Sequence, residues 1–128
     1  MTDLSAYLTD IELALIRSPL VATYQIVRSE INTDAGYIRL RATLVNGDFL
    51  EAAEYFILEH DAIVTDDYRY QWMNASKTRL RKRWDCTPDH PELPNFPHHV
   101  HVDDEHTVTA GQVLRLIDLL DMLERELE

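Results

Sequence analysis

The sequence predicts a single α+β domain, in which an antiparallel meander of about five strands is flanked by an N-terminal and a C-terminal helix. Three observations predict this fold class: helical periodicity at both ends, alternating apolar and polar residues between them, and short turn sequences separating the alternating runs. The chain has 128 residues, 45% of them hydrophobic, which suits one core. We therefore expect residues 1–128 to form one domain.

An amphipathic helix is expected near the N-terminus. Its apolar residues follow helical spacing at Leu4, Leu8, Ile11 and Leu15. Thr2 or Asp3 is suited to cap it, because a short polar side chain accepts a hydrogen bond from the first free backbone amides. Ser18 and Pro19 should end the helix, since proline cannot continue it.

The middle of the chain alternates with period two, which is typical of strands. The expected strands cover residues 23–29, 38–44, 49–59, 62–73 and 79–85. For residues 49–59 helix propensity leaves a helix as the alternative. In residues 62–73 we expect Val64, Tyr68, Tyr70 and Trp72 to share a face with Asp66.

Turn sequences separate these runs at residues 34–36, 46–47, 60–61 and 74–76. Asn46-Gly47 is the strongest of them, because both central residues of the favoured hairpin turn have positive φ, which asparagine and glycine tolerate.

After His106 the pattern returns to a helix. Thr109 and Gln112 have the spacing of a capping box. An apolar stripe follows, made by Val113, Leu116 or Ile117, Leu120, Leu123 and Leu127. The opposite face is expected to be solvated and carries Asp118, Asp121, Glu124, Glu126 and Glu128.

The segment from Trp84 to His101 raises the question of function. It holds four of the chain's five prolines and four of its six histidines. Because proline lacks a backbone donor and biases its predecessor towards extended geometry, we expect a stiff surface track here and neither a helix nor a central strand. His99 and His101 should point to one side of this track and His98 to the other. A solvated surface connection is the simplest interpretation.

Clustered histidines also suggest chemistry, because imidazole titrates near neutral pH and binds metals as the neutral ring. As an acid–base site, the candidate catalytic residues are His90, His98, His99, His101 and Asp85, with His99 and His101 side by side at a cleft. As a metal site, the candidate ligands are His90, His98, His99 and His101.

Residues just before this track are candidates for binding a phosphate-containing substrate. Arg79, Arg81 and Arg83 are in phase on one expected strand, and one of them should reach the histidines. Tyr68 and Tyr70 on the preceding strand are candidates for stacking on bases. The structural alternatives are a solvated edge strand for the arginines and core packing for the tyrosines.

Charge and composition restrict the partners. A net charge of −11 disfavours unaided binding to nucleic acid and favours a basic protein partner. The single cysteine, Cys86, suits a reducing compartment, and the sequence shows neither a leader-like N-terminus nor a long apolar run. We expect a cytosolic protein without a membrane partner. Dispersed glycines and the lack of paired cysteines exclude a phosphate-binding glycine loop and a cysteine-type zinc site.

The stretch YRYQWMNASKTRLRKRWDCTPDHPELPNFPHHVH resembles the hallmark segment of the TumE-type toxins of prokaryotic toxin–antitoxin pairs. In that segment a tyrosine-rich strand precedes an aromatic-Asp-Asn-Ala-Pro-His-His-Pro-Glu-Leu stretch and then Phe-Pro-His-His-x-His. The chain matches from Trp84 to His101, except that Cys86 and Thr87 replace Asn-Ala and Asp89 replaces the first histidine. If that histidine is catalytic in the family, we expect this chain to be weakened or inactive.

The resemblance implies a toxin encoded beside a helix-turn-helix antitoxin, with RNA as the usual kind of target. With the residues above, we expect metal-independent phosphodiester cleavage in which histidines act as acid and base and no cofactor takes part. Bound divalent metal is the alternative for the same histidines, in a non-enzymatic metal-binding or protein-interaction module. The sequence leaves a homo-oligomer open.

Overall fold

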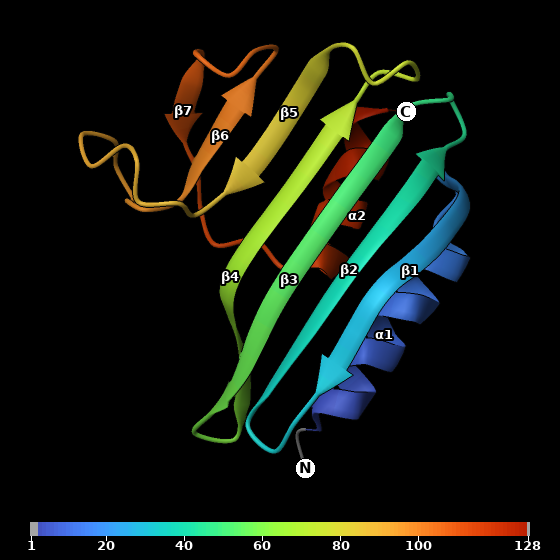
Figure 1. Ribbon diagram of the computed structural model, residues 1–128, viewed down its shortest axis with the longest axis vertical. Coiled ribbons are helices and arrows are strands. Elements are labelled where there is room, and N and C mark those ends of the chain that lie inside the picture. Colours follow the sequence, from blue (N-terminus) through green and yellow to red (C-terminus); the bar gives the residue numbers. More distant parts are fainter. Residues whose placement is uncertain (1–2, 128) are drawn as a thin grey trace.

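The main feature of the computed structural model, which describes residues 3–127, is a seven-stranded antiparallel sheet with the strand order β1-β2-β3-β4-β5-β6-β7. The strands are β1 (Val21–Ile31), β2 (Ala35–Leu44), β3 (Phe49–Glu59), β4 (Ala62–Met73), β5 (Leu80–Asp85), β6 (His99–Val102) and β7 (Val108–Ala110). Helices α1 (Leu4–Arg17) and α2 (Leu116–Glu126) both lie behind this sheet in Figure 1, so the other face is open. The α+β meander is confirmed, with two more strands than expected.

The first helix is confirmed where the spacing of apolar residues predicted it. The Asp3 side chain caps α1 by accepting a hydrogen bond of 2.8 Å from the amide of Ser5, and the helix ends before Ser18. Thr2, the other expected cap, lies outside the described residues, as does Glu128. Of the two described helices, neither is long and apolar enough to cross a membrane.

The hairpin turns differ from expectation. β3 forms as a strand over its expected range, which excludes the helical alternative. The turn before it is not of the expected type, because Gly47 has a positive φ and Asn46 does not. The Asn46 side chain instead accepts a hydrogen bond from the amide of Asp48. The two consecutive positive φ values occur at His60 and Asp61, 51° and 61°.

A bulge in β4 alters the expected face of its first half. Tyr55 pairs with Asp67 and Phe56 with Thr65, which leaves Asp66 as the extra residue. The prediction that Val64 and Asp66 share the face of Tyr68 was therefore wrong. Thr65 points to the covered face instead, where its hydroxyl binds Glu54.

The end of the chain contains two further errors of prediction. β6 is a central strand between β5 and β7, although we expected none before residue 101. The prolines end at Pro97, so the amides from His99 onward are free to pair. Residues 108–110 form β7, and α2 begins only at Leu116, after Arg115 and without a side-chain cap. The capping box at Thr109 and Gln112 is therefore wrong, and Val113 is exposed.

The core lies between the helices and the covered face of the sheet. It includes Ile11 and Leu15 of α1, Leu120 and Leu123 of α2, and the inward-facing residues Ile38, Leu40, Leu50, Phe56 and Tyr70 of the strands. One charged residue interrupts it, since Glu54 on β3 is fully buried among them.

A candidate functional site on the open face of β5 and β6

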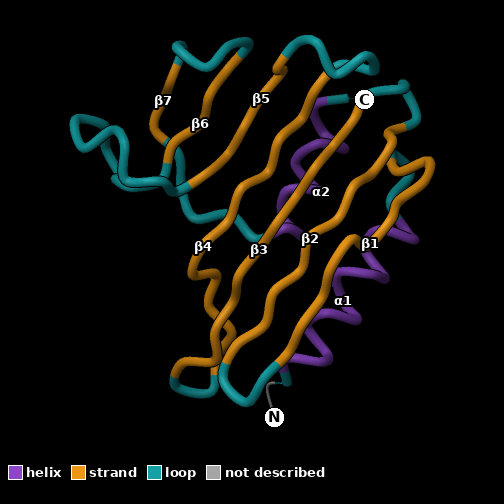
Figure 2. Tube along the Cα trace, in the orientation of Figure 1, coloured by secondary structure: helices purple, strands orange, loops and turns teal. Residues whose placement is uncertain are grey.

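Strand pairing brings the candidate residues together. Asp85 of β5 pairs with His99 of β6, and Arg83 pairs with His101. Since side chains alternate along a strand, these four side chains share a face, while Trp84 between them is buried on the other. The loop at residues 86–98 connects the two strands (Figure 2). It brings the ring of His90 against that of His99.

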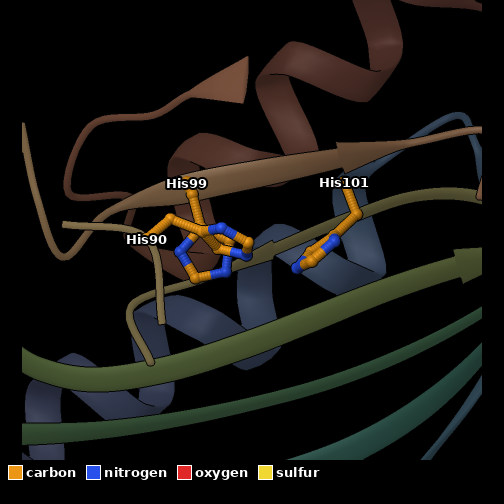
Figure 3. A group of neighbouring side chains, drawn as sticks. All are labelled: His90, His99 and His101. Atoms are coloured by element: carbon orange, nitrogen blue, oxygen red, sulfur yellow. The ribbon is translucent and has the colours of Figure 1, made fainter. Parts of the chain in front are cut away.

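The three imidazoles form a compact group. The ring centroids of His99 and His101 lie 4.9 Å apart, and that of His90 lies 5.0 Å from His99 and 6.0 Å from His101. Figure 3 shows the three rings gathered together, with His90 against His99 and His101 across from them. Asp85 joins the group, because its Oδ1 lies 2.8 Å from Nε2 of His99 and its Oδ2 lies 3.6 Å from Nε2 of His101.

Backbone carbonyls orient the two buried rings. Nδ1 of His99 donates to the carbonyl of Pro97 at 2.9 Å, and Nδ1 of His101 donates to the carbonyl of Glu105 at 3.0 Å. A carbonyl oxygen only accepts, so each Nδ1 carries a proton, and in the neutral ring Nε2 then carries the lone pair. Nε2 of His99 is buried and has no hydrogen-bond partner among residues 3–127, although Oδ1 of Asp85 lies 2.8 Å away.

Asp85 is held as a carboxylate. Burial works to raise its pKa, but hydrogen bonds from the hydroxyl and amide of Thr87, at 2.8 and 3.1 Å, together with the adjacent histidines, hold that pKa below its usual value. Burial and the charge of Arg83 lower the pKa of His101, although its bond to Glu105 and the charge of Asp85 oppose this. The site thus favours an ionised Asp85, while His101 loses its proton more readily than a free imidazole.

His98 does not belong to the group. Its ring stacks on Tyr68 with centroids 5.8 Å apart, and its Nδ1 lies 2.9 Å from the tyrosine hydroxyl. The expected surface position of the histidine track was also wrong for two residues, since His99 is 1% exposed and His101 is 6% exposed. His90 is the most accessible of the three rings in the group, with 29% of its side chain exposed.

The expected arginine row is dispersed. Arg83 contacts Asp85 at 3.3 Å and Glu105 at 3.2 Å, so one arginine does lie beside the histidines. Arg81 falls at a register shift in the pairing with β4 and binds Asp48 instead. Arg79 is exposed before the start of β5, at the opposite end of the strand from Asp85.

The tyrosines expected to stack on bases belong to the core. Tyr70 is fully buried and its hydroxyl donates to the carbonyl of Leu114, while Tyr68 is 4% exposed and donates to the carbonyl of Gln112. Their expected role as stacking surfaces was wrong, because the covered face of β4 packs against the segment before α2.

Sequence reasoning missed Arg69. The register aligns Arg39, Ala53, Arg69, Asp85 and His99 in one row across five strands. Arg69 is exposed and makes no ion pair with any residue between 3 and 127. It also borders a hollow of about 340 Å³ over Ala53, together with Tyr37 and Tyr55. Period-two spacing in the sequence shows only that Arg69 lies on the opposite face of its strand from Tyr68 and Tyr70. The row that contains Arg69, Asp85 and His99 results from the pairing of separate strands, which the spacing does not reveal.

The fold and this site define a small α+β protein with a buried carboxylate–histidine centre on the polar face of its sheet. The family model described as "Toxin TumE" matches residues 11–128. The chain therefore belongs to the TumE toxin family and is a toxin of a toxin–antitoxin system, which implies an antitoxin partner. No curated protein and no solved structure matches it.

Proposed function

We propose that this toxin cleaves phosphodiester bonds of RNA at the site formed by Asp85, His90, His99 and His101. The observation that carries the proposal is the row across the open face, which places the unpaired cation Arg69 beside Asp85 and one strand further from His99. Neighbouring strands are about 5 Å apart, so a phosphate held by Arg69 lies within reach of the histidines.

RNA cleavage needs groups of these kinds. One group removes a proton from the attacking hydroxyl, another protonates the leaving oxygen, and cations stabilise the charge that develops on the phosphate. The site offers imidazoles, the carboxylate of Asp85, and the guanidinium groups of Arg69 and Arg83. Arg83 is already paired with Asp85 and Glu105, which leaves Arg69 as the better candidate for the phosphate.

The individual histidines differ in what they can reach. His90 has the most exposed ring of the group and comes from a loop, so it is the imidazole best placed to touch RNA. His99 and His101 are almost enclosed, with side chains 1% and 7% exposed. The sequence led us to expect that His99 and His101 act as acid and base without a metal ion. For this mechanism an RNA oxygen must enter the nearly enclosed space beside their rings.

The open face is also a suitable binding surface for RNA despite the net charge of −11. Tyr37 and Tyr55 border the hollow over Ala53, and aromatic rings on an open sheet face can stack on unpaired bases. Arg39 and Arg41 extend the polar face but share Glu51, at 3.1 and 2.9 Å. Contacts with RNA would therefore concentrate near Arg69.

A non-enzymatic ion-binding module is the second candidate function. The observation that favours it is the buried Nε2 of His99, which has no hydrogen-bond partner. In that case the histidine group would stabilise a surface used by another protein, and RNA would remain intact.

The antitoxin is proposed to be a basic helix-turn-helix protein. Asp121 and Glu124 of α2 make no ion pair with the residues that the structure describes, and the whole chain is acidic. A basic antitoxin would be attracted to this surface, and its affinity would fall as salt concentration rises.

Cleavage of purified RNA, together with growth arrest on expression, tests the proposed function. His90→Gln should lower the cleavage rate roughly 100-fold or more and abolish growth arrest, since one group that transfers or positions a proton is lost. His106→Gln is the matched control, because His106 is exposed in a loop outside the site and should cleave like the wild type.

Arg69→Gln should weaken RNA binding about tenfold, and Arg79→Gln should leave it unchanged. The proposal fails if the wild type leaves RNA intact under conditions in which its expression arrests growth. Equal cleavage by the His90 and His106 variants would remove His90 from the reaction.

A further inference from the structure

We propose that Asp85, His90, His99 and His101 bind one divalent transition-metal ion of the zinc type. The inference deepens the proposed function by naming the ion that its site holds, and it rests on that function only for the ion's part in RNA cleavage. Binding of the ion itself follows from the geometry of the site and can be measured without RNA.

The donor atoms of the three histidines converge on one point of the site. His90, His99 and His101 each offer one ligand atom, and these atoms lie within 4.8 Å of one another. In a tetrahedral zinc site with bonds of about 2.1 Å, neighbouring ligand atoms are about 3.4 Å apart. The two contacts of Asp85 with Nε2 atoms, 2.8 and 3.6 Å, fall on either side of that value. Small side-chain adjustments would complete the site.

The two buried rings are oriented as histidine ligands of a metal ion are. In metal sites the nitrogen of a histidine that does not bind the ion commonly donates to a backbone carbonyl or a carboxylate, which fixes the ring and directs the other nitrogen to the ion. His99 and His101 both do so, through Pro97 and Glu105. In its neutral form, each ring then presents the lone pair of Nε2 to Asp85.

The contact between His99 and Asp85 is unfavourable unless a cation accompanies it. Nε2 of His99 is buried, lies 2.8 Å from a carboxylate oxygen and has no hydrogen-bond partner among the described residues, and in the neutral ring this nitrogen carries a lone pair. Buried polar atoms are normally paired, and two electron-rich atoms repel at this distance. A divalent cation between the imidazoles and Asp85 removes both problems at once.

The surroundings of the carboxylate support the same conclusion. Two bonds from Thr87 hold Oδ1, and Nε of Arg83 lies 3.3 Å from Oδ2. Such contacts orient a carboxylate ligand in metal sites. His98, one residue from His99, has its own partner in Tyr68, so the ligand set differs by one residue from that expected on sequence grounds.

The donor set indicates the kind of ion. Three imidazoles and one carboxylate suit zinc, cobalt, nickel or ferrous iron, whereas magnesium and calcium prefer oxygen ligands. With four protein ligands, such an ion would polarise a phosphate oxygen or activate a water molecule only by taking it as a fifth ligand. The ion would then replace the imidazoles as the group that assists proton transfer.

Metal binding by the metal-free full-length protein tests the proposal. Calorimetric titration with Zn²⁺ should give one ion per chain, and Co²⁺ should give the visible absorption of a tetrahedral nitrogen and oxygen site. His90→Gln and Asp85→Asn should each weaken Zn²⁺ binding roughly 100-fold or more, whereas His98→Gln should bind like the wild type. Circular dichroism identifies variants that fail to fold, and His90 lies in a loop, so its variant keeps the test decisive.

The outcomes separate the ion from the reaction. A wild type that binds no Zn²⁺ and no Co²⁺, or a folded His90 variant that binds both ions like the wild type, overturns the metal site. Zn²⁺ binding without RNA cleavage supports the site and refutes the proposed function. Cleavage by protein that binds no ion supports the function and refutes the metal site.

Discussion

Two buried carboxylates lie on opposite faces of the same sheet and have very different surroundings. Glu54, on the covered face, accepts hydrogen bonds from the Tyr7 hydroxyl at 2.6 Å, the Thr65 hydroxyl at 2.8 Å and the Leu116 amide at 3.2 Å. These donors come from α1, β4 and the start of α2. Asp85, on the open face, is held by Thr87 and Arg83 but also faces two imidazole nitrogens that have no proton to donate when the rings are neutral.

The difference separates a structural role from a functional one. A buried carboxylate whose neighbours are all donors is satisfied, and Glu54 explains why both helices and β4 meet at one point. Asp85 is stabilised as a carboxylate by Thr87, but with neutral imidazoles its oxygens also face two lone pairs, and a cation between them would relieve that repulsion. Burial of charge alone does not identify a site, whereas the identity of the neighbouring atoms does.

The largest effect is expected from a change at Asp85, in the cluster that it forms with the three histidines. Asp85→Asn keeps the shape of the side chain but removes its charge, so the rate of RNA cleavage should fall roughly 1,000-fold, equivalent to about 4 kcal/mol. Cleavage kinetics of the purified variant measure this. Asp89→Asn, an exposed carboxylate in the adjacent loop, is the matched control and should be fully active. Equal rates for the two variants would place the reaction elsewhere.

A change at Glu54, which accepts three hydrogen bonds, should lower the stability of the fold. Glu54→Ala leaves three donors without their acceptor and should lower the free energy of unfolding by about 3 kcal/mol, as measured by urea denaturation. Glu51→Ala lies on the open face of the same strand, where its ion pairs are partly exposed, and should cost less than about 1 kcal/mol. If both variants were equally stable, Glu54 would not hold the helices to the sheet.

The pH dependence of the free energy of unfolding should reveal the raised pKa of Glu54. Burial raises its pKa above the ordinary value of 4.5, although the bonds from Tyr7, Thr65 and Leu116 oppose this. The folded state therefore keeps its proton at pH values where the unfolded state has lost it. This contribution is complete below the unfolded pKa and is lost as the pH rises through the folded pKa. Urea denaturation between pH 4 and 8 should show this decline in the wild type and not in Glu54→Gln. A decline of equal size in the variant would assign it to another group.

The smallest effect is expected at Cys86, which follows Asp85. Burial, with Asp67 and Asp85 nearby, raises the pKa of its thiol to about 11, although the backbone of Tyr68 opposes this. The thiol is therefore protonated and unreactive at neutral pH. Cys86→Ser should retain growth arrest, and alkylation of the wild type by iodoacetamide should be slow. Rapid alkylation together with an inactive serine variant would make Cys86 a nucleophile.

Local signals in the sequence predicted much of the fold. The spacing of Leu4, Ile11 and Leu15 predicted α1, and alternation predicted β3 and most of the meander. β6 was not predicted because proline disfavours strands, and this short strand begins at His99, only two residues after Pro97. The start of α2 was misplaced because Thr109 and Gln112 imitate a cap, while β7 depends on pairing with β6 rather than on its own three residues.

The site could be predicted in part. Proline and histidine spacing identified His90, His99, His101 and Asp85, which the structure brings together. Their burial and ring orientation depend on the carbonyls of Pro97 and Glu105 and on the register between β5 and β6, none of which leaves a pattern in residue types. The position of Arg69 beside Asp85 likewise follows only from the pairing of β4 with β5.

The most direct test of the central claim is the thermal unfolding of the metal-free protein with and without Zn²⁺. An ion that binds only the folded state at about 100 times its dissociation constant adds about 2.7 kcal/mol, which for a chain of this size raises Tm by roughly 10 °C. The wild type and Glu51→Ala should show this rise, and Asp85→Asn should not. A wild-type Tm that Zn²⁺ leaves unchanged, or an equal rise in Asp85→Asn, would contradict a metal centre at Asp85 and the three histidines.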